Sequence, residues 1–162
     1  MKAVPLLFLI AISGLMAFDK PKFDSFGFVF NLVVQSIDQT HYNPLYINDS
    51  TSVRFFNRVI NTDLNKKFLT ASDSAELSRF KLELDDQIIS ENLVFFKSYV
   101  DCIKKRLQEK KTWSEELLQK PIALETTDYY ETDGEKQGFA KSNNELKNEW
   151  RKMILYQILV RV

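Results

Sequence analysis

Turn-forming residues are scarce in this sequence, and their scarcity limits the folds open to it more than any other feature. The chain has only 4 Gly and 4 Pro in 162 residues. A β-sandwich or barrel of this length uses many more of both, because every connection between its strands needs a turn. The hydrophobic fraction of 44% is enough for a modest core. We therefore expect an all-α fold: an irregular domain of about five helices, with one long loop before the last helix.

Five segments carry apolar residues at the spacing of three and four that marks one face of a helix. We expect helices at about 24–42, 49–60, 70–88, 93–120 and 143–158. In the fourth, a polar stretch between Leu107 and Trp113 predicts that the middle of the helix projects into solvent. Ser142 and Glu145 have the spacing of a capping box at the start of the last helix. Residues 121–142 form the long loop, and loops of this length usually carry function or belong to a larger assembly.

The first residues are typical of a secretory signal peptide. Met1-Lys2 is positive, and Ala3 to Phe18 follows without a charge. This run is shorter than the roughly 20 apolar residues of a membrane span, so no stable span is expected after cleavage. We place the last removed residue at Ala17, which leaves 18–162 as the mature chain in the periplasm. Two alternatives remain open: an uncleaved signal that anchors the chain to the inner membrane, and a buried first helix.

Charge and composition exclude several function classes. The 22 Lys+Arg balance the 22 Asp+Glu, so no basic field attracts nucleic acid. One Cys and one His can build neither an internal disulfide nor a zinc site, and we expect no metal or cofactor. His41 has no nucleophile elbow to serve, and the Ser-x-x-Lys spacing at Ser78 and Lys81 is better explained by chance. We expect no catalytic residue in this chain.

Contact with another protein is the function that the sequence favours. Tyr129, Tyr130 and Phe139 are aromatic residues in the long loop, where they could anchor a partner or fold onto the helices. The chain ends on MILYQILVRV, which includes Leu155 and Leu159 and is apolar on more than one face. Natural domain ends are usually polar. We expect this end to continue into, or dock on, further protein, and we name these five residues as candidate contacts.

The segments together resemble the N-terminal region of bacterial tail-specific, or carboxy-terminal processing, proteases of the Bacteroidetes type. The resemblance rests on an ordered set of stretches across roughly residues 30–162: His41-Tyr42-Asn43-Pro44 with Ile47-Asn48-Asp49; Asn65 to Thr70 with Ser72-Asp73; Leu84 to Ile88 leading to Leu93 and Phe95-Phe96; Lys120-Pro121; and Phe139 to Ser142 through Glu145-Leu146 and Trp150 to Lys152. One departure is Thr62-Asp63-Leu64-Asn65, where the family often has Leu-Asp-Pro-Asn.

The resemblance implies a role within a periplasmic serine endopeptidase that degrades proteins from their C-terminal tails. In that family a PDZ domain and a catalytic domain with a Ser-Lys dyad follow this region, and neither is present here. The implied role is a non-catalytic scaffold that helps to enclose substrate, in a truncated or partial protease. Implied partners are the downstream protease domains, substrate polypeptides or an adaptor lipoprotein. The alternative is a standalone exported helical module that binds protein.

Overall fold

The computed structural model describes residues 25–42, 46–119, 121–122 and 126–161. The signal peptide predicted for residues 1–17 lies outside the described residues. The described helices are α2 (Ser25–Thr40), α3 (Asp49–Ile60), α4 (Asp63–Phe68), α5 (Ala71–Leu77), the 3-10 turn η2 (Ser78–Phe80), α6 (Leu84–Ile89), α7 (Val94–Leu118) and α8 (Asn143–Leu159). No strand occurs in the described part, which confirms the all-α fold.

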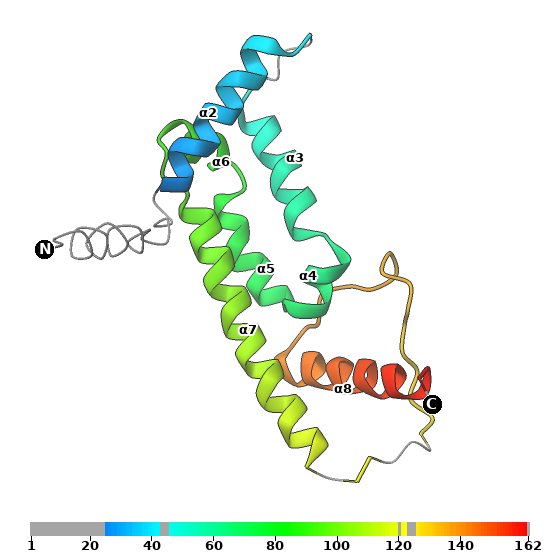
Figure 1. Ribbon diagram of the computed structural model, residues 1–162. Coiled ribbons are helices and arrows are strands. Elements are labelled where there is room, and N and C mark those ends of the chain that lie inside the picture. Colours follow the sequence, from blue (N-terminus) through cyan, green and yellow to red (C-terminus); the bar gives the residue numbers. More distant parts are fainter. Residues whose placement is uncertain (1–24, 43–45, 120, 123–125, 162) are drawn as a thin grey trace, which may run out of the picture.

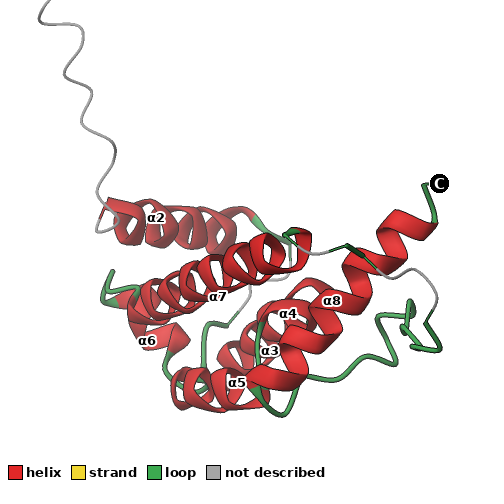
Figure 2. Cartoon of the chain, turned by 90° about the horizontal axis from the view of Figure 1, so that it is seen from below, coloured by secondary structure: helices red, strands yellow, loops and turns green. Residues whose placement is uncertain are grey.

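Helix α7 runs along most of the molecule, and the other helices pack on it at different heights (Figure 1). Helices α2, α3 and α6 lie toward one end of α7, and α8 crosses near the other end. Seen from below, α2 and α8 lie on different sides of the α7 axis (Figure 2). The described part of the loop climbs beside α8 to the level of α4 and then returns to the start of α8.

The apolar core forms around one ring. Phe95, at the start of α7, is fully buried, and the rings of Phe56, Phe80 and Phe96 lie within 6.1 Å of its centroid. Aromatic pairs at this separation stabilise the core beyond their buried area. The buried cluster is completed by Ile60, Leu69, Leu77 and Leu84. It therefore joins α3 and the 69–84 segment to the first turns of α7.

The predicted helix from Thr70 to Ile88 is broken into α5, η2 and α6, so the expectation of one continuous helix is wrong. The amide N–H groups of Lys81 and Glu83 bond to carbonyls three residues back, both at 3.0 Å, and these tight turns end the α-helical ladder. The breaks bring Leu77, Phe80 and Leu84 onto the same core. The prediction of which apolar residues are buried was thus correct, whereas the prediction of one continuous helix failed because packing on the core breaks the helix. Helix α4, which Thr62 caps, was not expected at all.

Helix α2 docks by a close backbone approach. A Cβ atom on Gly27 would lie 2.0 Å from the carbonyl oxygen of Glu91, so only glycine fits there. Glu91 itself has φ of 58°. One turn along, the Asn31 side chain donates to the carbonyls of Ile88 and Ile89 and caps the end of α6. The apolar stripe expected here, made of Phe26, Phe30, Val33 or Val34, and Ile37, is correct only in part. Phe30 and Val34 are half-buried, whereas Phe26, Val33 and Ile37 are exposed.

Candidate contact surface of the loop and helix α8

Helix α8 and the preceding loop hold all five predicted contact residues, so this region is the candidate site. The Ser142 hydroxyl accepts from the amide of Glu145, as the capping pattern predicts. The Glu145 carboxylate, however, accepts from the amide of Lys141 at 2.7 Å. The start of α8 is therefore fixed by side chains on both sides of its first turn.

A buried arginine holds the start of α8 against α5 and α7. Arg106 is only 5% exposed, and its Nε and Nη2 donate to the two carboxylate oxygens of Asp73 at 2.8 and 2.9 Å. Its Nη1 donates to Glu109 at 2.7 Å and also to the side-chain oxygen of Asn143, the first residue of α8. Since a guanidinium satisfies several acceptors in one plane, Arg106 fixes three helices in one geometry.

The charges of this group shift one another. Burial raises the pKa of Asp73, but hydrogen bonds from the amide and hydroxyl of Thr70 and the charge of Arg106 outweigh it, so the net pKa lies below its usual value. Burial works against the charged form of Arg106, and hydrogen bonds to Glu109 and Asp73 more than restore it, so its pKa is raised. Both groups therefore stay ionised and paired.

A second buried cation, Lys110, lies one turn further along α7 and is 2% exposed. Its Nζ donates to the carbonyl of Lys67 at 2.6 Å and lies 4.7 Å from the ring centroid of Phe68 and 3.8 Å from that of Trp150. These contacts join α7 to the end of α4 and the middle of α8. Burial, together with the charge of Arg106, lowers the pKa of Lys110 to about 7.

The expectation that the polar middle of α7 projects into solvent is therefore correct only in part: Gln108, Lys111 and Thr112 are exposed, whereas Lys110 is buried. The buried stripe of this helix runs through Phe95, Arg106 and Lys110, and Leu107, expected on the buried face, is half-exposed. The missed signal was the position of Arg106 and Lys110: they lie four residues apart, in register with Phe95 and Cys102. Long cationic side chains at such positions can be buried where acceptors reach them.

The loop is attached to the helical body at several points. Ala140 pairs with Thr70 in an isolated parallel bridge, in which the Ala71 amide donates to the Ala140 carbonyl at 2.8 Å. Lys66 of α4 donates to the carbonyl of Gly134 at 2.9 Å. On the other side, Arg151 of α8 binds the Asp128 carboxylate at 2.6 Å.

The five predicted contact residues fall into two groups, exposed residues and residues that pack within the chain. Tyr129 is 72% exposed, and Leu159 is 49% exposed at the end of α8. The ring of Tyr130 packs on that of Tyr156 in a tilted arrangement with centroids 5.4 Å apart, and Phe139 packs against the apolar core. Leu155 is buried, at 5% exposure. Tyr129 and Leu159 are thus exposed on the surface, whereas the other three hold the loop and α8 within this chain.

Of the residues considered for chemistry, Ser78 is engaged locally. The Ser78 hydroxyl donates to the carbonyl of Ala75 at 2.6 Å, within its own helical turn. Cys102 is half-buried, and burial, followed by the Asp73 charge, raises its pKa to about 11.

Within the described ranges, no group of three His, Cys, Asp or Glu side chains is placed to hold a metal ion. None of the helices described is both long and apolar enough to cross a membrane.

Comparison with known proteins gives the family of this architecture. The chain is 29% identical over 116 residues to the tail-specific protease of Haemophilus influenzae; the match covers 70% of this chain and 17% of that protein. The match thus spans less than a fifth of the length of this curated relative. Residues 33–162 also match the family model described as the tail-specific protease N-terminal domain. Because that match takes in the second half of α2 and everything from α3 to α8, this chain belongs to the tail-specific protease N-terminal domain family.

Proposed function

We propose that residues 18–162 act as a non-catalytic helical scaffold that helps to enclose the substrate of a periplasmic tail-specific serine protease. The observation that carries this proposal is the family match over residues 33–162, which names an N-terminal domain of a protease. The Ser-Lys dyad and the peptide-binding domain are then supplied by other parts of the enzyme. Protein is the partner, either those parts, a substrate polypeptide or an adaptor lipoprotein.

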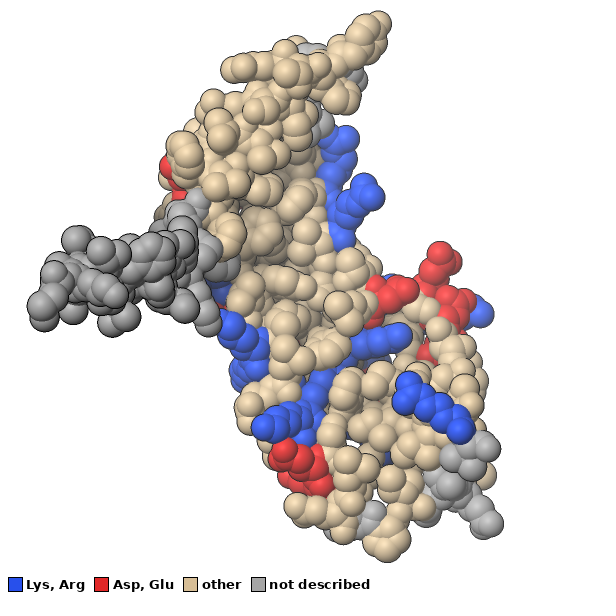
Figure 3. Space-filling view, viewed as in Figure 1, with Lys and Arg blue, Asp and Glu red and all other residues tan. Residues whose placement is uncertain are grey.

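The form of the domain supports a scaffold role. Arg106 and Lys110 lock α8 to α4, α5 and α7 through buried directional contacts, so the domain can present its surfaces in a fixed arrangement. Apolar side chains remain exposed on the outer face of α2, including Phe28, Val29 and Leu32. Few charged residues are visible over that end of the molecule (Figure 3). Exposed apolar faces of this kind mark protein contacts.

A chimera tests the scaffold proposal. The tail-specific protease of Haemophilus influenzae, with the matched region replaced by residues 18–162, should degrade an unfolded test protein; a variant with an unrelated helical domain there should not. Residues 18–162 alone should cleave nothing. Cleavage by the isolated domain that survives Ser78→Ala and repurification would overturn the proposal, as would equal activity of the two chimeras.

Export through the signal peptide is part of the same proposal. Fractionated cells of the source organism, probed with an antibody against residues 18–162, should show the antigen in the periplasm, in a band several times heavier than this chain. Sequencing of the mature N-terminus should start at Phe18. A band near the mass of this chain, soluble in the periplasm, would instead favour the standalone binding module, and a band retained in the inner membrane would favour an uncleaved signal.

A further inference from the structure

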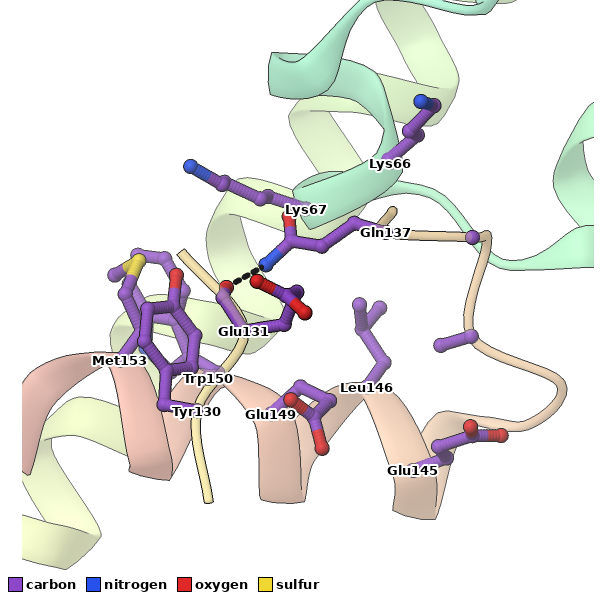
Figure 4. A pocket seen from close by; sticks show the side chains of 12 residues that line it. Lys66, Lys67, Tyr130, Glu131, Gln137, Glu145, Leu146, Glu149, Trp150 and Met153 are labelled. Atoms are coloured by element: carbon purple, nitrogen blue, oxygen red, sulfur yellow. Dashed lines mark hydrogen bonds between the residues drawn. The ribbon is translucent and has the colours of Figure 1, made fainter. Parts of the chain in front are cut away.

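An apolar cavity of about 190 Å³ lies between α2, α6 and the start of α3, at the end of the domain away from α8 (Figure 1). It is partly open to solvent, and its apolar lining residues are Phe30, Val34, Ile47, Phe55, Leu84 and Ile88. We call it the α2 cavity. Another cavity, of about 200 Å³, lies between α4, α8 and residues 130–140, but lysine, glutamine and glutamate side chains line it (Figure 4). The α2 cavity is therefore the one suited to an apolar group.

The polar residues of the lining form hydrogen bonds within the protein. The Ser52 hydroxyl donates to Asp85 Oδ1 at 2.6 Å and accepts from the Asp85 amide at 2.8 Å. The Thr51 hydroxyl donates to the carbonyl of Tyr46, also at 2.8 Å. A buried water needs about two to four polar partners, and cavities lined by apolar side chains stay dry. The α2 cavity therefore favours an apolar occupant over water.

Hydrogen bonds and one aromatic ring fix the three walls of the α2 cavity. The Asn31 side chain bonds α2 to the end of α6, and the hydrogen bonds at Asp85 join α3 to α6. The Phe96 ring contacts both α2 and α3, since its centroid is 6.1 Å from that of Phe30 and 6.0 Å from that of Phe55. Each pair of walls is thus connected without help from an occupant, and the cavity is formed before anything binds.

The volume of the α2 cavity matches one apolar side chain of medium size. A protein cavity of roughly 150 Å³ lined by Leu, Ile and Phe accepts a benzene ring. A cavity of about 190 Å³ therefore has room for a leucine, isoleucine or phenylalanine side chain. The acyl chain of a membrane lipid has more than twice the carbons of a benzene ring, so most of it would remain outside. The volume thus favours a polypeptide over a lipid as the source of the occupant.

An unfolded polypeptide exposes side chains of this kind. Folded proteins bury most of their leucine, isoleucine and phenylalanine residues, whereas an unfolded chain leaves them in water. Val29 and Leu32, on the outer face of α2, are 52% and 53% exposed, so a chain that reaches the cavity meets further apolar surface on the same helix. Few charged residues are visible over this end of the molecule (Figure 3). The surroundings therefore suit an uncharged, apolar stretch of polypeptide.

We propose that the α2 cavity binds one leucine, isoleucine or phenylalanine side chain of an unfolded polypeptide. The side chain leaves water and contacts apolar residues of α2, α3 and α6 at once, and the peptide backbone stays at the opening. The site performs no chemistry; it holds an apolar residue of the polypeptide against α2. The inference rests on the proposed function only for the origin of that polypeptide, a substrate of the protease.

Blocked tripeptides test the site directly. The protein, labelled with ¹³C in the methyl groups of Ile, Leu and Val, is titrated with acetyl-Gly-Leu-Gly amide and acetyl-Gly-Phe-Gly amide. Acetyl-Gly-Asn-Gly amide is the matched control, because asparagine has the shape of leucine with a polar end. We expect saturable shifts of the Val34, Ile47 and Ile88 methyl signals with the first two peptides. The asparagine peptide should bind at least about tenfold more weakly, the equivalent of 1.4 kcal/mol.

Two variants of neighbouring residues decide whether the peptides bind in the cavity. Val34→Phe fills the cavity and should abolish the shifts of Ile47 and Ile88. Val33→Phe adds the same ring at a position that is 49% exposed and outside the lining, and should leave the shifts unchanged. If Val34→Phe does not fold, Ile88→Ala decides, because it enlarges the cavity at a half-buried position. It should raise the affinity for the phenylalanine peptide relative to the leucine peptide by at least about threefold, and an unchanged ratio would overturn the proposal.

Four other results would overturn the proposal: no saturable shift with either apolar peptide; equal binding of the asparagine peptide; tighter binding of acetyl-Gly-Lys-Gly amide, which would mean that the Asp85 carboxylate selects the occupant; or shifts retained in Val34→Phe. A dimer that Val34→Phe dissociates would also overturn it, since a second copy would then fill the cavity. The chimera test of the proposed function does not depend on these titrations. A chimera that degrades its test protein while the cavity binds neither apolar peptide would refute this inference and leave the scaffold proposal standing.

Discussion

The buried ammonium of Lys110 should make the stability of this domain rise with pH, and a Lys110→Met variant should remove that rise. The side chain is 2% exposed, and burial with the nearby Arg106 charge lowers its pKa to about 7 from the usual lysine value of 10.5. Below pH 7 both the folded and the unfolded chain carry the proton, so the full penalty of burying the charge is present. Between pH 7 and 10.5 the folded state has lost the proton that the unfolded chain retains. Stability therefore increases as the pH rises through this window.

The size of the effect follows from the two pKa values. The difference in free energy of unfolding between wild type and Lys110→Met should grow by about 2 kcal/mol from pH 7 to pH 9, since each unit of differential protonation contributes up to about 1.4 kcal/mol. At pH 7 the variant should lie near the wild type, because methionine fills the same space without a charge, although the Lys67 carbonyl loses its donor.

The assay is urea unfolding followed by far-UV circular dichroism at half-unit steps from pH 6 to pH 9. Lys111→Met is the matched control: it lies next to Lys110 on α7, but its side chain is 67% exposed and its ammonium is 4.0 Å from Glu115. That variant should run parallel to the wild type. If Lys110→Met also runs parallel, to within about 0.5 kcal/mol, then Lys110 stays protonated in the folded state. The carbonyl of Lys67 and the rings of Phe68 and Trp150 would then outweigh its burial, and the reasoning would be refuted.

Three further outcomes follow from the described contacts. Arg106→Leu leaves the Asp73 carboxylate buried without its bidentate partner and should lower the free energy of unfolding in urea by about 3–5 kcal/mol, whereas Lys105→Leu, at an exposed position, should lower it little. Adding Asp73→Asn to Arg106→Leu should recover part of the loss. A loss below about 1 kcal/mol for Arg106→Leu would contradict this account of the buried pair. Gly27→Ala sets a Cβ 2.0 Å from the Glu91 carbonyl and should speed hydrogen exchange in α2, while Gly138→Ala, whose Cβ meets nothing within 4 Å, should not; similar exchange in both would refute the close approach. Cys102, with its pKa raised to about 11, should react with a disulfide reagent at pH 8 roughly a hundredfold more slowly in the folded than in the urea-unfolded protein, and rates within a factor of three would count against its burial.

The sequence predicted the helices well where local signals act alone. The expected 49–60 segment coincides with α3, because Asn48 caps its first turn and the apolar residues keep strict helical spacing. Helix α8 likewise starts after Ser142, as its capping residues indicate. The all-α fold followed from the scarcity of turn residues, and no long-range contact was needed to infer it.

Prediction failed where long-range contacts decide the local structure. The break at Ser78–Phe80 is made by packing on Phe95, which lies 15 residues beyond Phe80 and was assigned to another helix. The burial of Arg106 depends on Asp73 and Asn143, 33 and 37 residues away in the chain. Prediction from residue spacing assigns a cation such as Arg106 to solvent, because the spacing does not show which distant acceptors will pack beside it. The cavity of about 200 Å³ between α4, the loop and α8 was missed for the same reason, since its lining comes from three separate parts of the chain.

The start and the middle of α7 are held in different ways, and this difference bears on how α8 can move. Near Phe95 the contacts are apolar and non-directional, so helices there can shift a little and keep most of their burial. Near Lys110 the contacts are a guanidinium, an ammonium and their specific acceptors, which lose their partners if α8 rotates or slides. A small displacement of α8 would leave Arg106 or Lys110 as a buried charge with fewer partners, at a cost of several kcal/mol. Helix α8 should therefore leave its position as a unit rather than gradually.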